Sequence, residues 1–165
     1  MQRLTSNNSG GSGVSSWDIS PDGNFSHVQD FTWNMTHPGP NAAQDMPHPH
    51  EVILDPTGSY IVVPDLGADK LRVFSIEKPS GNLVERQAFS TPPGTGPRHG
   101  AFRMDDYNTF LFLVSELGNR VTSYVVFSDE KALYFTEAYE DNIYNNMISP
   151  ADSAAAEGLL SASTP

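Results

Sequence analysis

The chain has 165 residues, of which 20 are acidic and 9 are basic, so its formal net charge is −11. Nucleic acids and anionic membranes select basic surfaces, which argues against both as partners, while a local arginine still permits a small anionic substrate. The absence of cysteine excludes disulfides and thiolate metal sites. No apolar run approaches the ~20 residues of a membrane span, and the N-terminus lacks the apolar stretch of a secretory signal. We therefore expect a soluble protein, cytoplasmic or, if its N-terminus is truncated, secreted.

The first part of the chain predicts a flexible segment followed by a hairpin. Residues 1–12 are rich in Ser, Asn and Gly and are expected to be flexible. Residues 14–34 alternate apolar and polar side chains on either side of a Pro-Asp-Gly turn, which is typical of two paired strands.

Residues 52–76 predict three short strands in succession, at 52–54, 60–63 and 71–76. The segments between them are rich in Asp, Gly and Pro, the residues that tight turns need. A fourth strand is expected to end near Phe89.

The same pattern recurs along the chain, which decides the predicted fold. Trp17 and Phe31 in the first hairpin match Phe74 and Phe89 in the second unit. Residues 50–53, 60–67 and 71–74 match residues 99–102, 111–118 and 121–124. A third start is expected at residues 157–160.

Four short strands over roughly fifty residues make up one β-propeller blade. We predict an all-β partial propeller over residues 13–158, with an outer half-blade at 14–34 and full blades at 50–91 and 99–140. The next blade is expected to start at 154–160, with an irregular tail at 159–165. Propellers typically close with four to eight blades, so we expect a fragment or shortened version of a longer propeller, whose open blade faces permit self-association.

The first strand of each blade lines the central channel, so the loops before these strands are candidate sites. We expect His50, His99 and Glu157 at equivalent positions near the channel mouth, and Asp65 and Glu116 as a second equivalent set. A meander sandwich with similar hairpins is the alternative fold.

Several residues near these loops have both a functional and a structural interpretation. His48 and His50 point the same way in a Pro-bracketed extended segment, as a general base or metal ligand, or simply as loop residues. Arg98 is either an anion clamp or the structural partner of a nearby carboxylate. Glu116 is either a general acid or base, or a water-exposed carboxylate. A metal site formed by His48, His50 and His99 has no fixed ligand spacing and is the weakest hypothesis.

These motifs resemble the lactonase family of seven-bladed β-propellers. The resemblance rests on residues 47–50, 55–58, 63–69, 96–99 and 115–117, which occur in order with family-like spacing, and extends from about residue 13 to 158. The family includes propeller-type 6-phosphogluconolactonases and carboxy-cis,cis-muconate cyclases. After Gly158 the match ends, and a further channel arginine of the family, which belongs to a later blade, has no counterpart in these residues.

The resemblance implies a channel site in which His50, Arg98 and Glu116 are catalytic. His48, His99, Asp65 and Glu157 are expected to bind substrate, and no cofactor or metal is expected. The substrate would be a small anionic lactone or muconate. Hydrolysis and lactone formation both need one anion clamp and one proton-transfer group, so both remain open. A non-catalytic propeller fragment or binding module is the alternative from another class.

Overall fold

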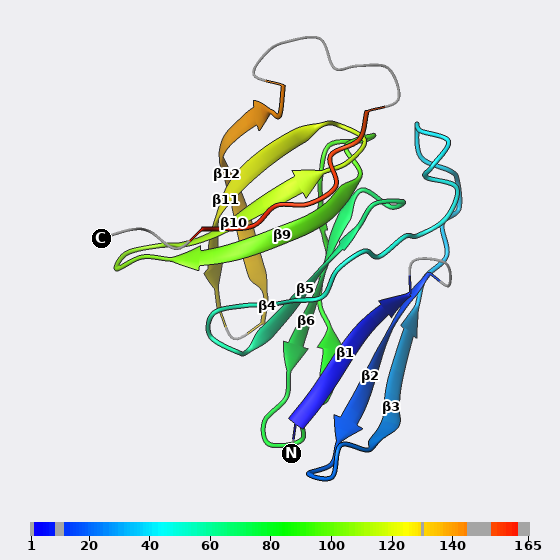
Figure 1. The fold of residues 1–165 in the computed structure, drawn as a ribbon, viewed down its shortest axis with the longest axis vertical. Helices are drawn as coiled ribbons and strands as arrows, with labels where there is room; N and C mark the ends of the chain where they lie inside the picture. The colour runs from blue at the N-terminus through cyan, green and yellow to red at the C-terminus, as the bar shows by residue number, and fades with distance from the viewer. Residues whose placement is uncertain (1, 9–11, 130, 145–152, 162–165) are drawn as a thin grey trace.

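The computed structural model describes residues 2–8, 12–129, 131–144 and 153–161, and the regular structure within them is entirely β (Figure 1). The strands are β1 (Gln2–Asn8), β2 (Gly13–Ile19), β3 (Phe25–Thr32), β4 (Ile53–Leu54), β5 (Tyr60–Asp65), β6 (Lys70–Ile76), β7 (Leu83–Glu85), β8 (Phe89–Ser90), β9 (Pro97–Met104), β10 (Thr109–Ser115), β11 (Arg120–Ser128) and β12 (Leu133–Asn142). No helix among these residues is long and apolar enough to cross a membrane.

The strands form three antiparallel sheets. The first has the order β1-β2-β3, the second β4-β5-β6-β7 with β8 also paired to β6, and the third β12-β11-β10-β9. The second and third sheets span residues 53–90 and 97–142, where full blades at 50–91 and 99–140 were predicted. The first sheet is larger than the predicted hairpin, because β1 pairs with β2 along its whole length. Residues 2–8, which were expected to belong to a flexible segment, therefore form a paired strand in the structure.

Two clusters of buried apolar side chains join the sheets face to face. One lies between the first and second sheets and includes Val14 and Phe74. The other lies between the second and third sheets and includes Val73 and Leu111. Because side chains alternate along a strand, β5 and β6 contribute one face to each cluster. This explains why all of β5 is buried, and burial of each of its aliphatic side chains, Ile61, Val62 and Val63, stabilises the fold by about 1.5–3 kcal/mol.

A recurring turn shows that the three sheets are copies of one unit. Ser12, Asp69 and Asn119 have positive φ angles of 55°, 49° and 50°, and each immediately precedes β2, β6 or β11. Their carbonyls each accept a hydrogen bond from a backbone N–H further along the chain, in Trp33, Thr91 and Ile143 respectively. The strands β2, β6 and β11 are therefore equivalent, as are β1, β5 and β10. The first sheet has no counterpart of β4 or β9 among the described residues.

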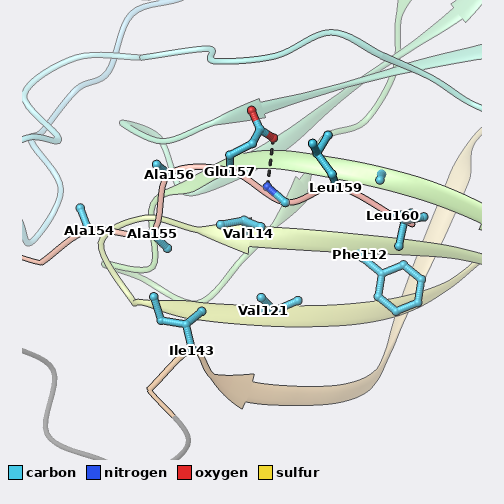
Figure 2. Close-up of a pocket in the computed structure, with 12 residues that line it drawn as sticks. Phe112, Val114, Val121, Ile143, Ala154, Ala155, Ala156, Glu157, Leu159 and Leu160 are labelled. Carbon is cyan, nitrogen blue, oxygen red and sulfur yellow. Dashed lines mark hydrogen bonds between the residues drawn. The ribbon is translucent and has the colours of Figure 1, made fainter. Parts of the chain in front are cut away.

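The described C-terminal segment, residues 153–161, runs across the third sheet without forming a strand (Figure 1). The strand start predicted at 154–160 is therefore not a strand here. The segment and the sheet enclose an apolar pocket of about 460 Å³, lined by side chains that include Phe112, Val121 and Ala155 (Figure 2). Residues 159–161 are irregular, as expected for the tail, and residues 162–165 lie outside the described part.

Candidate functional site

The loop before β9 positions Arg98 through a β-bulge. On the ladder between β9 and β10, His99 pairs with Val114 and Pro97 pairs with Ser115, so Arg98 is an extra, unpaired residue between them. Bulges commonly redirect a side chain next to an active site. The backbone thus separates Arg98 from the regular alternation of β9.

The loop before β4 has the same irregularity, and there the extra residue lies near His50. Ile53 pairs with Val62 and Pro49 forms an isolated bridge with Asp65. Four steps along one strand therefore oppose three along the other. The N–H of His50 donates to the carbonyl of Pro64 (3.0 Å), which fixes this segment beside the end of β5.

The pairing registers of the two sheets correct the predicted equivalences by one residue. Pro49 and Pro97 occupy matching positions, so His50 corresponds to Arg98, and the residue equivalent to His99 is Glu51. Likewise Asp65 corresponds to Ser115 rather than to Glu116. A one-residue slip in matching two strands assigns every side chain to the wrong face, and sequence matching alone did not detect it.

A buried carboxylate holds the loop that carries His50. Oδ1 of Asp65 accepts the N–H of His48 (2.8 Å) and of Ala68 (3.1 Å). Its Oδ2 accepts from Nε and Nη2 of Arg72, both at 2.7 Å. Gly67 permits the close approach of this loop, because a Cβ there would lie 1.7 Å from the carbonyl oxygen of Met46.

Asp65 therefore has a different position from the one expected for a substrate-binding residue. Its side chain is 0% exposed, and both oxygens are engaged by the protein. Arg72 in turn lies over the ring of Trp33, with Cζ 3.9 Å from the ring centroid. This buried ion pair stabilises the loop that carries His50.

A second carboxylate holds the loop that carries Arg98. Asp69 accepts the N–H of Gly94 on Oδ2 (2.7 Å) and the N–H of Gly96 on Oδ1 (2.8 Å). Gly96 has a φ of +59°, and a Cβ there would lie 2.6 Å from the side chain of Leu117. Only glycine fits this left-handed, crowded position two residues before Arg98.

Arg98 forms an ion pair with Glu116. Its Nη1 lies 3.0 Å from Oε2 of Glu116, and both side chains are partly exposed, at 28% and 22%. Nε of Arg98 is buried and has no hydrogen-bond partner among the described residues. The pair therefore leaves donor capacity on the guanidinium, and the structural partner considered for Arg98 proves to be Glu116.

His50 lies in an environment that favours the neutral form of its imidazole. Burial lowers the pKa of His50 below its usual value, and the positive charge of Arg98 lowers it further, while Glu116 acts in the opposite direction. The ring of His50 lies 6.4 Å from that of His99, centroid to centroid. The three predicted catalytic residues, His50, Arg98 and Glu116, thus lie close enough for their charges to interact.

His99 joins three inner segments through carboxylates. Its Nδ1 lies 3.5 Å from Oε2 of Glu51 and 3.7 Å from Oε2 of Glu157. Glu51 also accepts the N–H of Gly100 (2.7 Å), which ties the segment before β4 to β9. Glu51 was missed as a site residue, although its place directly after His50 was a usable signal. Glu157 reaches the site from the segment that crosses the third sheet.

His48 lies at the edge of this group rather than within it. Its Nε2 contacts Oδ1 of the exposed Asp45 at 2.8 Å. No set of three or more His or acidic side chains within the described ranges has the geometry of a metal site. The arrangement as a whole offers a neutral histidine beside a partly exposed guanidinium, which suits proton transfer next to a bound anion.

Comparison with known proteins assigns this chain to a family. The family model described as "Lactonase, 7-bladed beta-propeller" matches residues 2–161. A probable 6-phosphogluconolactonase of Arthroderma benhamiae is 35% identical over 133 residues, covering 79% of this chain and 33% of that protein. The 6-phosphogluconolactonase of Bacillus subtilis is 37% identical over 86 residues, covering 52% of this chain and 24% of that protein. The chain thus spans about a third or less of these relatives.

Solved structures agree on the fold. A Lactobacillus plantarum protein superposes with a TM-score of 0.76 and 28% identity, covering 92% of this chain and 40% of the other. A putative 6-phosphogluconolactonase of Bacteroides fragilis gives 0.72 and 26%, covering 85% and 40%. The periplasmic gluconolactonase of Pseudomonas aeruginosa gives 0.66 and 26%, covering 85% and 37%.

Proposed function

Because the chain belongs to the lactonase family of seven-bladed β-propellers, we propose that its site hydrolyses a sugar lactone bearing an anionic group, such as 6-phosphogluconolactone. The names of the similar proteins support the reaction class. The observation that carries the proposal is the placement of the partly buried His50, whose pKa is lowered, beside the Arg98–Glu116 ion pair. The chain spans only part of its relatives, so the activity of the whole protein belongs to the proposal.

His50 is the proton-transfer group of this mechanism. A lowered imidazole pKa leaves the ring unprotonated at neutral pH, so that it can take a proton from a water molecule. The oxygen of this water attacks the lactone carbonyl carbon and forms a tetrahedral oxyanion. When the oxyanion collapses, the bond between that carbon and the ring oxygen breaks, and the proton on His50 passes to the leaving ring oxygen. The product is the open-chain hydroxy acid.

Arg98 supplies the positive charge that this reaction needs. Its guanidinium binds the anionic group of the substrate or the developing oxyanion, because charge-assisted hydrogen bonds to such groups are about twice as strong as neutral ones. Glu116 holds the guanidinium in place through the 3.0 Å contact. Loss of such a stabilising donor typically costs about 3 kcal/mol in the activation barrier.

The test is to measure hydrolysis of 6-phosphogluconolactone by the purified chain and its Arg98→Ala variant. We expect the wild type to hydrolyse the lactone and the variant to lose about 10²- to 10³-fold in kcat/KM. Arg103→Ala is the matched control, since Arg103 lies on the same strand and is exposed.

Two further substrates test whether Arg98 binds the phosphate group and whether the reaction is lactone hydrolysis. Unphosphorylated glucono-δ-lactone should react more slowly if Arg98 binds the phosphate, and the difference should vanish in Arg98→Ala. 3-Carboxymuconate should give no lactone. Absence of lactone hydrolysis by the wild type, or an unchanged rate in Arg98→Ala, would refute the proposal and favour a non-catalytic binding role.

A further inference from the structure

Glu51 joins the loop before β4 to β9 through one oxygen of its carboxylate. Its Oε2 accepts the N–H of Gly100 (2.7 Å) and lies 3.5 Å from Nδ1 of His99. Gly100 lies where β9 packs closely on β4, since a Cβ on it would be 3.1 Å from Cδ1 of Ile53. The contact therefore gives Glu51 a defined position between the second and third sheets.

The other oxygen of Glu51 takes no part in this contact. Oε1 accepts no hydrogen bond from any described residue and is accessible to solvent, and the same holds for Nε2 of His99. The side chains of Glu51 and His99 are 32% and 19% exposed. A link between the two strands needs only one carboxylate oxygen, so an acceptor oxygen and a ring nitrogen remain side by side for a ligand.

These two atoms lie next to the groups that the proposed reaction uses. The ring of His99 is 6.4 Å from that of His50, centroid to centroid. Arg98 and Glu116 lie close enough to His50 for their charges to act on it, and they form an ion pair with each other. The site therefore continues from this ion pair through His50 to His99 and Glu51.

A phosphorylated sugar lactone has the same order of chemical groups. In 6-phosphogluconolactone the phosphate is attached on the ring-oxygen side of the carbonyl carbon, and the ring hydroxyls begin on the other side. An ionised carboxylate only accepts hydrogen bonds, so it suits hydroxyl donors, and it repels a second anion. The residue types along the site match this order, with the cation of Arg98, then His50, then the carboxylate of Glu51.

We propose that Glu51, with His99 beside it, binds the ring hydroxyls of the lactone and so selects a sugar lactone over a lactone without hydroxyls. This inference rests on the proposed function and names the part of the substrate that Glu51 recognises. Oε1 of Glu51 accepts a hydrogen bond from one hydroxyl, and Nε2 of His99 contacts a neighbouring hydroxyl. Repulsion by the carboxylate keeps the anionic group of the substrate at Arg98.

The test compares two lactones with the same ring size, glucono-δ-lactone, which carries hydroxyls, and δ-valerolactone, which carries none. The measured quantity is the ratio of kcat/KM for the first lactone to kcat/KM for the second. We expect Glu51→Ala to lower this ratio about 10- to 100-fold, the effect of losing a hydrogen bond to a charged group. Glu137→Ala is the matched control, since Glu137 is exposed on β12, at the opposite edge of the third sheet from β9.

The ratio separates recognition of the substrate from support of the backbone. If Glu51 only held Gly100, Glu51→Ala would slow the hydrolysis of both lactones alike, and an unchanged ratio would overturn the proposal. Glu51→Gln keeps an oxygen for the N–H of Gly100 but loses the charge. We therefore expect its ratio to fall less than that of Glu51→Ala, with a midpoint of urea unfolding equal to that of the wild type.

Binding of the product tests the hydroxyl contacts independently of catalysis. If the wild type hydrolyses neither lactone, the proposed function fails, and calorimetry with the open-chain product 6-phosphogluconate, which carries the same hydroxyls, decides on Glu51. A dissociation constant raised about 10- to 100-fold in Glu51→Ala, and unchanged in Glu137→Ala, would support the hydroxyl contacts. Equal binding by the wild type and Glu51→Ala, or no binding by the wild type, would overturn them.

Discussion

The loops before β4 and β9 follow the same backbone course but are held by different side chains. Each contains one extra residue relative to its partner strand, His50 lying at this position in one loop and Arg98 in the other. The first loop is held by the buried ion pair of Asp65 and Arg72. The second is held by Asp69, which accepts from the backbone N–H groups of Gly94 and Gly96 and from the hydroxyl of Thr95. One structural repeat thus delivers a neutral base and a cation to adjacent places.

The largest expected effect is on the free energy of unfolding when the buried ion pair that holds the loop before β4 is broken. Replacing Asp65 by Ala leaves Arg72 buried without its partner, its side chain being only 7% exposed. We expect the free energy of unfolding to fall by about 3–5 kcal/mol, measured by urea denaturation. Asp22→Ala, in the exposed turn between β2 and β3, is the control. The double variant Asp65→Ala/Arg72→Met should recover part of the loss, and a loss below about 1 kcal/mol would contradict the role given to Asp65.

Asp69→Asn should have a smaller effect, because only one of two acceptor positions is lost. Asn retains one carbonyl oxygen in place of the two oxygens that accept from Gly94 and Gly96. A buried N–H left without an acceptor costs about 1–3 kcal/mol. Because this loop leads to Arg98, KM for the lactone should also rise. Steady-state kinetics and urea denaturation check both effects, with the exposed Asp106→Asn as control. An unchanged KM would show that this loop does not position Arg98 for substrate binding.

Glu116→Gln should change stability by less than about 1 kcal/mol, since its ion pair with Arg98 is partly exposed. Its clearer effect is on His50. The charge of Glu116 opposes the lowering of the pKa of His50, so its removal should lower that pKa further. Titration of the imidazole signals by NMR measures the shift. An upward shift would contradict the arrangement of these three residues.

The pH dependence of stability should carry a small contribution from His50. Its pKa is lower in the folded chain than the ordinary value of 6.5, so the unfolded chain binds the proton more readily. Above pH 6.5 this difference has no effect, and as pH falls below 6.5 the free energy of unfolding decreases. His50→Gln should show a weaker decrease in denaturation series from pH 7.5 to pH 5. An identical decrease in the variant would assign the pH dependence to other groups.

The repeat and the strands could be predicted from the sequence because they depend on local patterns. Alternation of apolar residues and turn residues such as Asp55 and Gly58 predicted the strands of the second sheet. The family resemblance and the fold were confirmed by the comparisons. The roles of the predicted site residues stay predictions, although His50, Arg98 and Glu116 do lie together.

Three features could not be predicted because they depend on contacts between distant segments. The flexible appearance of residues 1–12 concealed β1, whose pairing with β2 depends on a neighbouring strand rather than on its own composition. The strand pairings showed that His50 corresponds to Arg98 and not to His99. The role of Asp65 became evident only from its contact with Arg72, since a carboxylate at a strand end has the same sequence signature whether it is exposed or buried.

The sequence by itself determined an all-β repeat of about fifty residues, its family resemblance and the residue types available for an anionic substrate. These features follow from side-chain periodicity and turn chemistry, which act over a few residues. Only the tertiary structure decided which side chain each loop presents and which carboxylates support the backbone. Those outcomes depend on register and burial, and a single inserted residue in a ladder changes both.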